Sequence, residues 1–172
     1  MGWWCMSPEA IKTLISEIRA DLEAISQLLQ WLDETRQVIP PERSPSLQEK
    51  AAIGYLLHNL YSAFENIFKN IAGMFGNTIE ERETWHAHLL RRMTLEVEGV
   101  RPRVIGPQCY DALDELRRFR HLFRHAYALE LDWERLGLVL RKVDSVLRHR
   151  YQEELGAFLQ FLEGLSAELS QD

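Results

Sequence analysis

A short basic stretch late in the chain, residues 117–127, holds the residue types that chemistry on a phosphate group requires. Besides Arg118, its polar members are Arg117, Arg120, His121, Arg124, His125 and Tyr127. At about 100° per residue on a helix, the arginines and histidines fall on one side and Tyr127 lies at its edge. The apolar residues of the stretch fall on the other side. An acidic chain that gathers cations in this way has a local site for something anionic.

Arginine and histidine together suit the cleavage of RNA without a metal ion. That reaction needs a base for the 2′-hydroxyl, an acid for the leaving oxygen and cations on the phosphoryl oxygens. Histidine suits the proton transfers because its ordinary pKa lies near neutrality. The arginine fork can hold two phosphate oxygens at once, and neighbouring arginines favour the neutral form of His125 that a base requires. On spacing alone, however, a solvated surface or structural ion pairs explain such a face more often than a site does.

The elements that must position this stretch are all expected to be helices. Apolar residues recur at spacings of three and four over segments at about 7–37, 46–72, 84–97, 107–127 and 132–165. Ser7, Thr84 and Asp132 are candidate N-caps, and Pro40 follows the end of the first helix. No repeat or strand-period segment occurs. We therefore predict an all-α fold, a single domain over 1–172, built as an antiparallel bundle of four to five helices.

Composition limits the partners that this chain can have. The net charge is −6 and 46% of the residues are hydrophobic, which is typical of a soluble globular protein whose RNA contacts must be local. Cys5 and Cys109 fit neither a disulfide framework nor a zinc site. His86 and His88 point to different faces of a helix, so we expect no metal and no cofactor. No segment reads as a signal peptide or a membrane span, so we expect a cytoplasmic protein with no membrane contact.

The motif and its surroundings resemble a known family. Arg120-x4-His125-x-Tyr127 resembles the R-x4–6-H-x-Y signature of HEPN domains in the HepT toxin group, and His121 corresponds to the polar residue that usually follows the arginine. Three further segments are similar to HepT-like proteins: 57–65, 85–93 and 99–102. The resemblance covers about 51–163, with the motif on the expected late helix.

This resemblance implies a fold, an activity and a partner. The family fold is a helical bundle that dimerises, and the two motifs meet at the dimer interface in a composite, metal-independent ribonuclease site. By this resemblance Arg120 would bind the scissile phosphate and His125 would act as general base or acid. The supporting residues would be His121, Arg124 and Arg117. The partner of the homodimer would be an MNT nucleotidyltransferase antitoxin that adenylylates Tyr127, adding bulk and negative charge that block RNA.

A non-catalytic function is the alternative that the resemblance leaves open. Several relatives carry Asn at the position of His125, and Asn cannot transfer protons. A HEPN module that binds a nucleotide, RNA or a partner through the same cationic face would need only the arginines.

Other polar residues have two interpretations each. On the second helix His58, Asn59 and Glu65 either orient the motif helix or, more commonly, are satisfied core residues. Residues 85–92, with one tryptophan, two histidines and two arginines, either border an RNA groove or serve packing. The basic run 148–151 lacks the motif spacing and is expected to be a solvated helix face. Trp3 and Trp4 are expected to pack against a neighbour or a partner.

Overall fold

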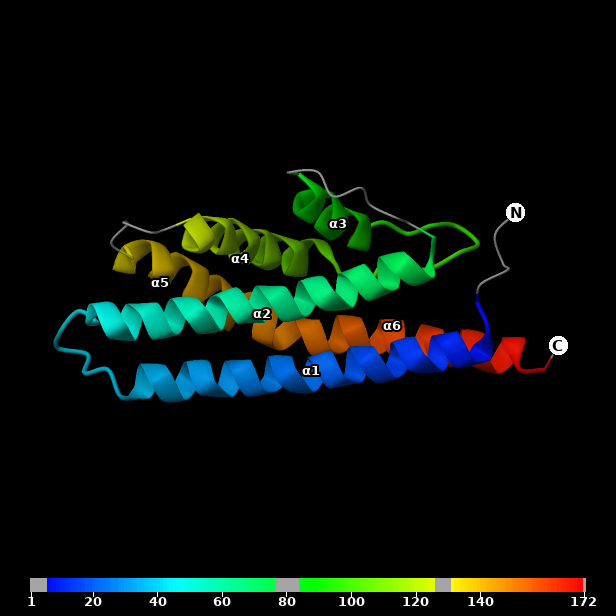
Figure 1. The fold of residues 1–172 in the computed structure, drawn as a ribbon, viewed down its shortest axis with the longest axis horizontal. Helices are drawn as coiled ribbons and strands as arrows, with labels where there is room; N and C mark the ends of the chain where they lie inside the picture. Colours follow the sequence, from blue (N-terminus) through cyan, green and yellow to red (C-terminus); the bar gives the residue numbers. More distant parts are fainter. Residues whose placement is uncertain (1–5, 77–83, 126–130, 172) are drawn as a thin grey trace.

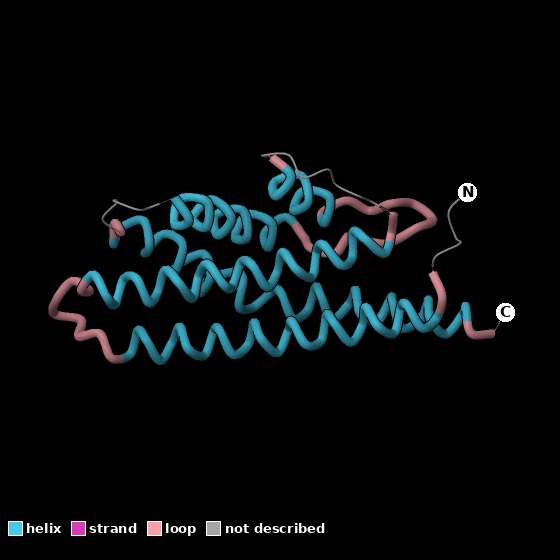
Figure 2. Tube along the Cα trace, viewed as in Figure 1, coloured by secondary structure: helices cyan, strands magenta, loops and turns pink. Residues whose placement is uncertain are grey.

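The computed structural model describes residues 6–76, 84–125 and 131–171, and the side chain of His125 lies outside the described part. The helical elements are α1 (Pro8–Gln37), α2 (Leu47–Met74), α3 (Trp85–Met93), α4 (Pro107–His125), α5 (Trp133–Lys142), the π-helical turn η2 (Val143–Leu147) and α6 (Arg148–Leu169). In the described residues the chain forms helices and loops without a strand (Figure 2). The all-α prediction is therefore confirmed.

The three longest helices form the body of the bundle. α1 packs against both α2 and α6, and α1 begins at the same end at which α6 finishes (Figure 1). α4 lies along α2 on the side away from α1, with α3 near one end of α4 and α5 near the other. Neighbouring long helices run in opposite directions, as expected for short connections. α4 thus packs against α2 along one side and also contacts α3, α5 and η2.

The helix ends follow the local sequence signals. Ser7 accepts a hydrogen bond from the Ala10 N–H and starts α1, and Ser46 with Glu49 forms a capping box at the start of α2. Asp132 caps α5 by accepting from the Glu134 N–H. Thr84 makes no side-chain hydrogen bond to α3, so its expected capping role is not found.

The interior is filled by the apolar stripes that the periodicity identified. The largest fully buried side chains come from α1, α2 and α6, and include Tyr61, Phe64, Phe68 and Phe158. Phe64 also makes an edge-on ring contact with Tyr151 of α6. Burial of several large side chains at one junction stabilises the packing of α2 on α6.

The third helix is shorter than predicted. The sequence predicted a helix to about Val97, whereas α3 ends at Met93. The reason is the buried guanidinium of Arg101, which donates to the carbonyls of Arg92, Leu95 and Pro102 and so holds the chain in a loop. A remote arginine thus satisfies carbonyls that would otherwise point along the helix axis.

The last helix is also interrupted. The sequence predicted one helix over about 132–165, but η2 separates α5 from α6, with the Arg148 N–H donating to the Val143 carbonyl. Such a π-helical turn inserts an extra residue and rotates the following face. Because α5, η2 and α6 follow one another without a break, the described chain still amounts to five helical rods, within the predicted range.

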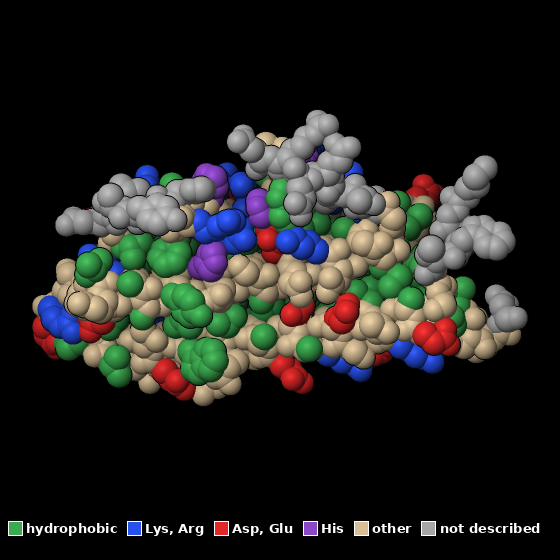
Figure 3. All heavy atoms as spheres, in the orientation of Figure 1, with side chains coloured by type: hydrophobic (Ala, Val, Ile, Leu, Met, Phe, Trp, Pro, Cys, Tyr) green, Lys and Arg blue, Asp and Glu red, His purple; other side chains and the backbone are tan. Residues whose placement is uncertain are grey.

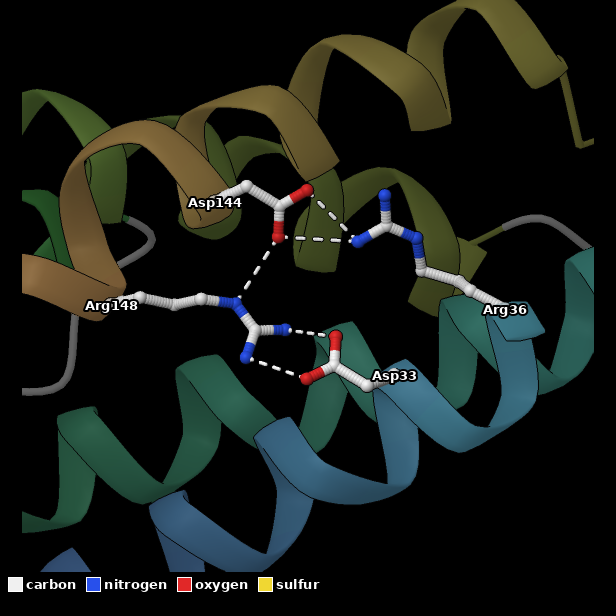
Figure 4. Close-up of polar contacts among 4 residues, drawn as sticks. All are labelled: Asp33, Arg36, Asp144 and Arg148. Atoms are coloured by element: carbon white, nitrogen blue, oxygen red, sulfur yellow. Dashed lines mark hydrogen bonds and ion pairs between the residues drawn. The ribbon is translucent and has the colours of Figure 1, made fainter.

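A network of four charged side chains joins this turn to α1. Arg148 donates to both carboxylate oxygens of Asp33, at 2.7 and 2.9 Å, and to Asp144 at 3.1 Å. Asp144 in turn pairs with Arg36 at 2.9 Å (Figure 4). The interpretation of run 148–151 as a solvated face is therefore wrong for two of its residues, since Arg148 is ion-paired and Tyr151 is only 2% exposed.

None of the helices in the described ranges has the length and apolar character that crossing a membrane requires.

Candidate functional site

One stripe of α2 faces the motif helix α4. Residues 54, 58, 62, 65 and 69 follow one another at spacings of three and four, which places them on one side of a helix. Gly54 lies under the Phe123 ring, and a Cβ atom at Gly54 would stand 2.6 Å from Phe123 Cε2. Absence of a side chain at Gly54 therefore allows α4 to approach α2 closely at this point.

Arg120 is held against this stripe by contacts from two sides. Its Nε donates to Ser62 Oγ at 3.3 Å, and its Nη2 lies 3.7 Å from Glu65 Oε2. The guanidinium also lies over the Tyr61 ring, 5.8 Å from its centroid. The Arg120 side chain is 15% exposed, so it reaches solvent but has little freedom to turn. A cation fixed in this way is prepared to meet an anion.

Glu65 connects three side chains at this site, those of Arg120, Lys69 and His86. Its carboxylate is buried, at 3% exposure, and lies 3.7 Å from Lys69 as well as from Arg120. Glu65 Oε1 also bonds to Nδ1 of His86, on α3. Both interpretations of Glu65 hold, because it is a buried residue and it also orients the motif arginine. Buried carboxylates need such partners, since an unpaired charge in the interior is costly.

The start of α3 is bound to the same cluster. Lys69 Nζ stands 4.4 Å from the centroid of the Trp85 ring, and the Trp85 ring lies 3.9 Å from that of His86. These contacts cover part of the tryptophan ring and hold His86 toward Glu65. Trp85 and His86 therefore belong to the support of the site, while His88 and Arg91 remain exposed on α3.

His58 stands one helical turn from Ser62 on the same stripe. Its ring lies 5.9 Å from that of Phe123, centroid to centroid, and its Nδ1 is buried without a hydrogen-bond partner. Burial lowers the pKa of His58, the charges of Arg120 and Arg124 lower it further, and Glu65 opposes them. The neighbouring Asn59 bonds instead to the Tyr55 carbonyl of its own helix.

The other described motif residues are more exposed than Arg120. Arg117 donates to Asp114 at 2.8 Å, an ion pair within α4, while His121 and Arg124 are exposed. His125 is the last residue of α4, and Tyr127 lies outside the described residues. The α4 face therefore places Arg120 beside Glu65, and both Arg120 and Arg124 close enough to His58 to act on its charge. Arg117 instead pairs within its own helix.

Charged side chains of both signs meet on the surface at this junction. Figure 3 shows histidine and Lys or Arg side chains side by side in the middle of one face, over α2 and the neighbouring α3 and α4. An acidic side chain lies among them in the same view. The surroundings of this patch are largely uncharged, so the cations stand out locally on an acidic chain.

The described residues contain no group of three or more His, Cys, Asp or Glu side chains arranged to hold a metal ion. Cys109 is a free, buried cysteine, and burial raises the pKa of its thiol. Cys5, like Trp3 and Trp4, lies outside the described residues.

Three members of the site were not identified as site residues from the sequence. Tyr61, Ser62 and Lys69 all contact Arg120 or Glu65. Their spacing from Glu65 on one helix face was the available signal. This spacing does not distinguish a site from ordinary packing, because tyrosine, serine and lysine are also common on helix faces without a site.

Comparison with known families agrees with this architecture. The family model of HepT-like proteins matches residues 52–162, a range that begins in α2 and ends in α6 and so includes the whole α2–α3–α4 site. The chain belongs to the HepT-like family, which makes it a HEPN-type protein and suggests a toxin-type ribonuclease domain. No curated protein and no solved structure matches the chain.

Proposed function

We propose that this protein is the toxin of a HEPN/MNT toxin–antitoxin pair and cleaves RNA internally without a metal ion. The observation that carries the proposal is Arg120, a nearly buried motif arginine fixed by Ser62 and Glu65 on the face that ends at His125. The charge of a purely structural arginine would be balanced by the carboxylate of its ion pair. Here the carboxylate also contacts Lys69 and His86, which leaves Arg120 positive charge for a phosphate.

The reaction uses the 2′-hydroxyl of the RNA as its nucleophile. The 2′-oxygen attacks the adjacent phosphorus, the bond from phosphorus to the 5′-oxygen breaks, and a 2′,3′-cyclic phosphate results. The 2′-hydroxyl proton leaves to a base and the 5′-oxygen receives a proton from an acid. His125 acts as general base or acid, and Arg120 binds the phosphoryl oxygens. His121, Arg124 and Arg117 support the site. The contribution of Arg117 is weakened by its ion pair with Asp114.

Two further parts of the proposal concern the assembly. The active form is a homodimer in which the motifs of two protomers form one composite site in the cytoplasm. An MNT nucleotidyltransferase antitoxin neutralises it by attaching AMP to Tyr127. The added phosphate places negative charge at the position where RNA phosphate would bind, and the nucleoside adds bulk. A small nucleotidyltransferase gene found beside the gene for this chain would support this pairing.

The direct test is cleavage of total cellular RNA in excess EDTA. The wild type is expected to cleave and leave 2′,3′-cyclic phosphate ends. The cleavage rate of His125→Ala is expected to be lower by about 10²–10⁴-fold, because one proton-transfer group is gone. His149→Ala is the matched control, since His149 is exposed on α6. Intact mass must show Tyr127 unmodified, and sedimentation velocity reports the dimer. Absence of cleavage by unmodified, folded protein contradicts the proposal.

The same assay separates the alternative. A non-catalytic module that binds RNA or a nucleotide predicts that His125→Ala leaves function unchanged, while Arg120→Ala removes binding. Loss of activity in His125→Ala with RNA binding retained excludes it.

A further inference from the structure

A histidine outside the motif lies where the substrate phosphate would be held. His58 of α2 packs its ring against Phe123 of α4, and Ser62, one turn further along α2, accepts from Arg120, which precedes Phe123 by one turn. α2 and α4 run antiparallel (Figure 1), as these two contacts require. His58 therefore faces the part of α4 between Arg120 and Arg124, and the two arginines influence its charge.

The two ring nitrogens of His58 have different surroundings. Nδ1 is buried and has no hydrogen-bond partner, while the residue as a whole is half-buried. Among the described residues no hydrogen bond is made by either nitrogen. This arrangement leaves Nε2 as the nitrogen that can meet a ligand.

The surroundings also select a protonation state. A buried N–H without an acceptor is rarer in proteins than an acceptor without a donor, so the proton of the neutral ring belongs on Nε2. The charged groups that face the ring are Arg120 and Arg124 from α4 and Glu65 from α2. The net effect of burial and these charges is to lower the pKa, which favours the neutral form of the ring. A neutral ring with its proton on Nε2 is a hydrogen-bond donor and is poorly suited to move protons.

We propose that His58 is a further substrate-binding residue of this site, whose Nε2–H donates to a non-bridging phosphoryl oxygen beside the Arg120 guanidinium. This inference rests on the proposed RNA cleavage and adds a role to it. The proton transfers remain with the motif histidine, and His58 supplies a second donor at the oxygens on which negative charge develops. The Phe123 contact and the close approach at Gly54 hold the ring in place.

Three substitutions separate a donor from a packing residue and from an acid–base group. His58→Leu keeps apolar bulk and removes the donor, so we expect cleavage to fall about 10²–10³-fold, as for other donors aimed at developing charge. His58→Gln places an amide N–H at the reach of Nε2 and is expected to recover most of that loss. His58→Asn places its amide near the position of Nδ1 and is expected to behave like His58→Leu.

The pH profile gives the decisive readout. Because the donor is not titrated, His58→Gln is expected to keep the wild-type shape of the pH–rate profile between about pH 6 and 9. Loss of one limb in His58→Gln would show proton transfer by His58 and overturn the inference. Equal activity of His58→Leu and wild type, or equal impairment of His58→Gln and His58→Leu, would also overturn it.

A binding measurement distinguishes failure of this inference from failure of the proposed function. An oligonucleotide with 2′-O-methyl groups cannot be cleaved, and its affinity is expected to be lower for His58→Leu than for wild type or His58→Gln. If the wild type cleaves RNA and His58→Leu binds and cleaves equally well, only the inference about His58 fails. If the wild type neither binds nor cleaves RNA, both proposals fail.

Discussion

At the scale of single residues, Glu65 decides how the cations of the site are arranged. Its buried carboxylate contacts Arg120, Lys69 and His86, which belong to three different helices. These contacts fix both the position of the motif arginine and the attachment of α3. Beside an arginine proposed to bind phosphate, an acidic residue weakens the attraction for RNA but reduces the number of positions that the guanidinium can take.

Replacement of Glu65 is therefore expected to affect both stability and activity. We expect Glu65→Ala to lower the free energy of unfolding by about 3 kcal/mol, because it leaves partly buried cations without their counter-charge. Urea denaturation monitored by circular dichroism measures this change. Cleavage should also fall, since Arg120 loses a contact that holds it.

The matched control is Glu163→Ala. Glu163 pairs with Arg19 at 2.6 Å, but the two side chains are 49% and 59% exposed. Exposed pairs contribute about 0–1 kcal/mol, so this variant should remain close to the wild type. Equal effects of the two substitutions would contradict the role of Glu65.

At the scale of helices, the approach of α4 to α2 depends on Gly54. Phe123 occupies the space of a missing side chain, and its ring also packs against Phe119 and His58. The position of the motif along α2 is thus determined by an apolar contact one turn away from Arg120.

Gly54→Ala is expected to destabilise the protein although alanine favours helices. Overpacking at a contact of this kind costs about 1–3 kcal/mol, which exceeds the gain of up to about 1 kcal/mol from helix propensity. Thermal unfolding and RNA cleavage should both show a loss, since α4 or the Phe123 ring must move. Gly164→Ala on α6 has open space around the new methyl group and should instead be stabilising by about 0.5–1 kcal/mol. Similar gains from both variants would contradict the close approach.

The start of α2 gives a prediction about acidity. The pKa of Glu49 is lowered to about 2 by hydrogen bonds from the Arg43 side chain and from the Ser46 backbone N–H. Because the pKa is lower in the folded state, Glu49 stabilises the fold above its ordinary value of 4.5, and this contribution is lost as the pH falls through about 2. NMR titration of the Glu49 carboxyl should show this value, and Arg43→Ala should raise it. An ordinary pKa in the wild type would contradict the capping arrangement.

At the scale of the whole molecule, the network of Arg36, Asp33, Asp144 and Arg148 joins the first helix to the last. It crosses from α1 to the π-helical turn and α6 (Figure 4). The network lies at the interrupted part of the last helix, where charged side chains rather than apolar ones connect α1 to η2 and α6.

Arg148→Ala is expected to lower the free energy of unfolding by about 1–2 kcal/mol, since hydrogen bonds to charged groups are lost from two carboxylates. The difference from wild type should shrink at high salt, because the side chains are partly exposed and screened. Urea denaturation at low and high salt measures both effects. Arg150→Ala, on the exposed face of α6, is the control and should change stability little. A loss independent of salt would contradict an ionic role for the network.

The sequence by itself determined the parts of this protein that depend on local periodicity and local chemistry. The helices α1, α2 and α4, the caps at Ser7 and Asp132, and the division of α4 into an apolar face and a cationic face follow from neighbouring residues. The resemblance to HepT-like proteins likewise depends on residues within short segments, and the family match confirms it. Packing against other helices did not change these features.

Only the tertiary structure decided which distant residues meet. Glu65, His86 and Arg120 lie on three helices far apart in the chain, so their contact depends on how the helices pack and in which register. The early end of α3 depends on the Arg101 side chain, and the interruption of the last helix accompanies the ion pairs of Arg148. In each case the energy of a long-range contact outweighs local helix propensity, which is small per residue.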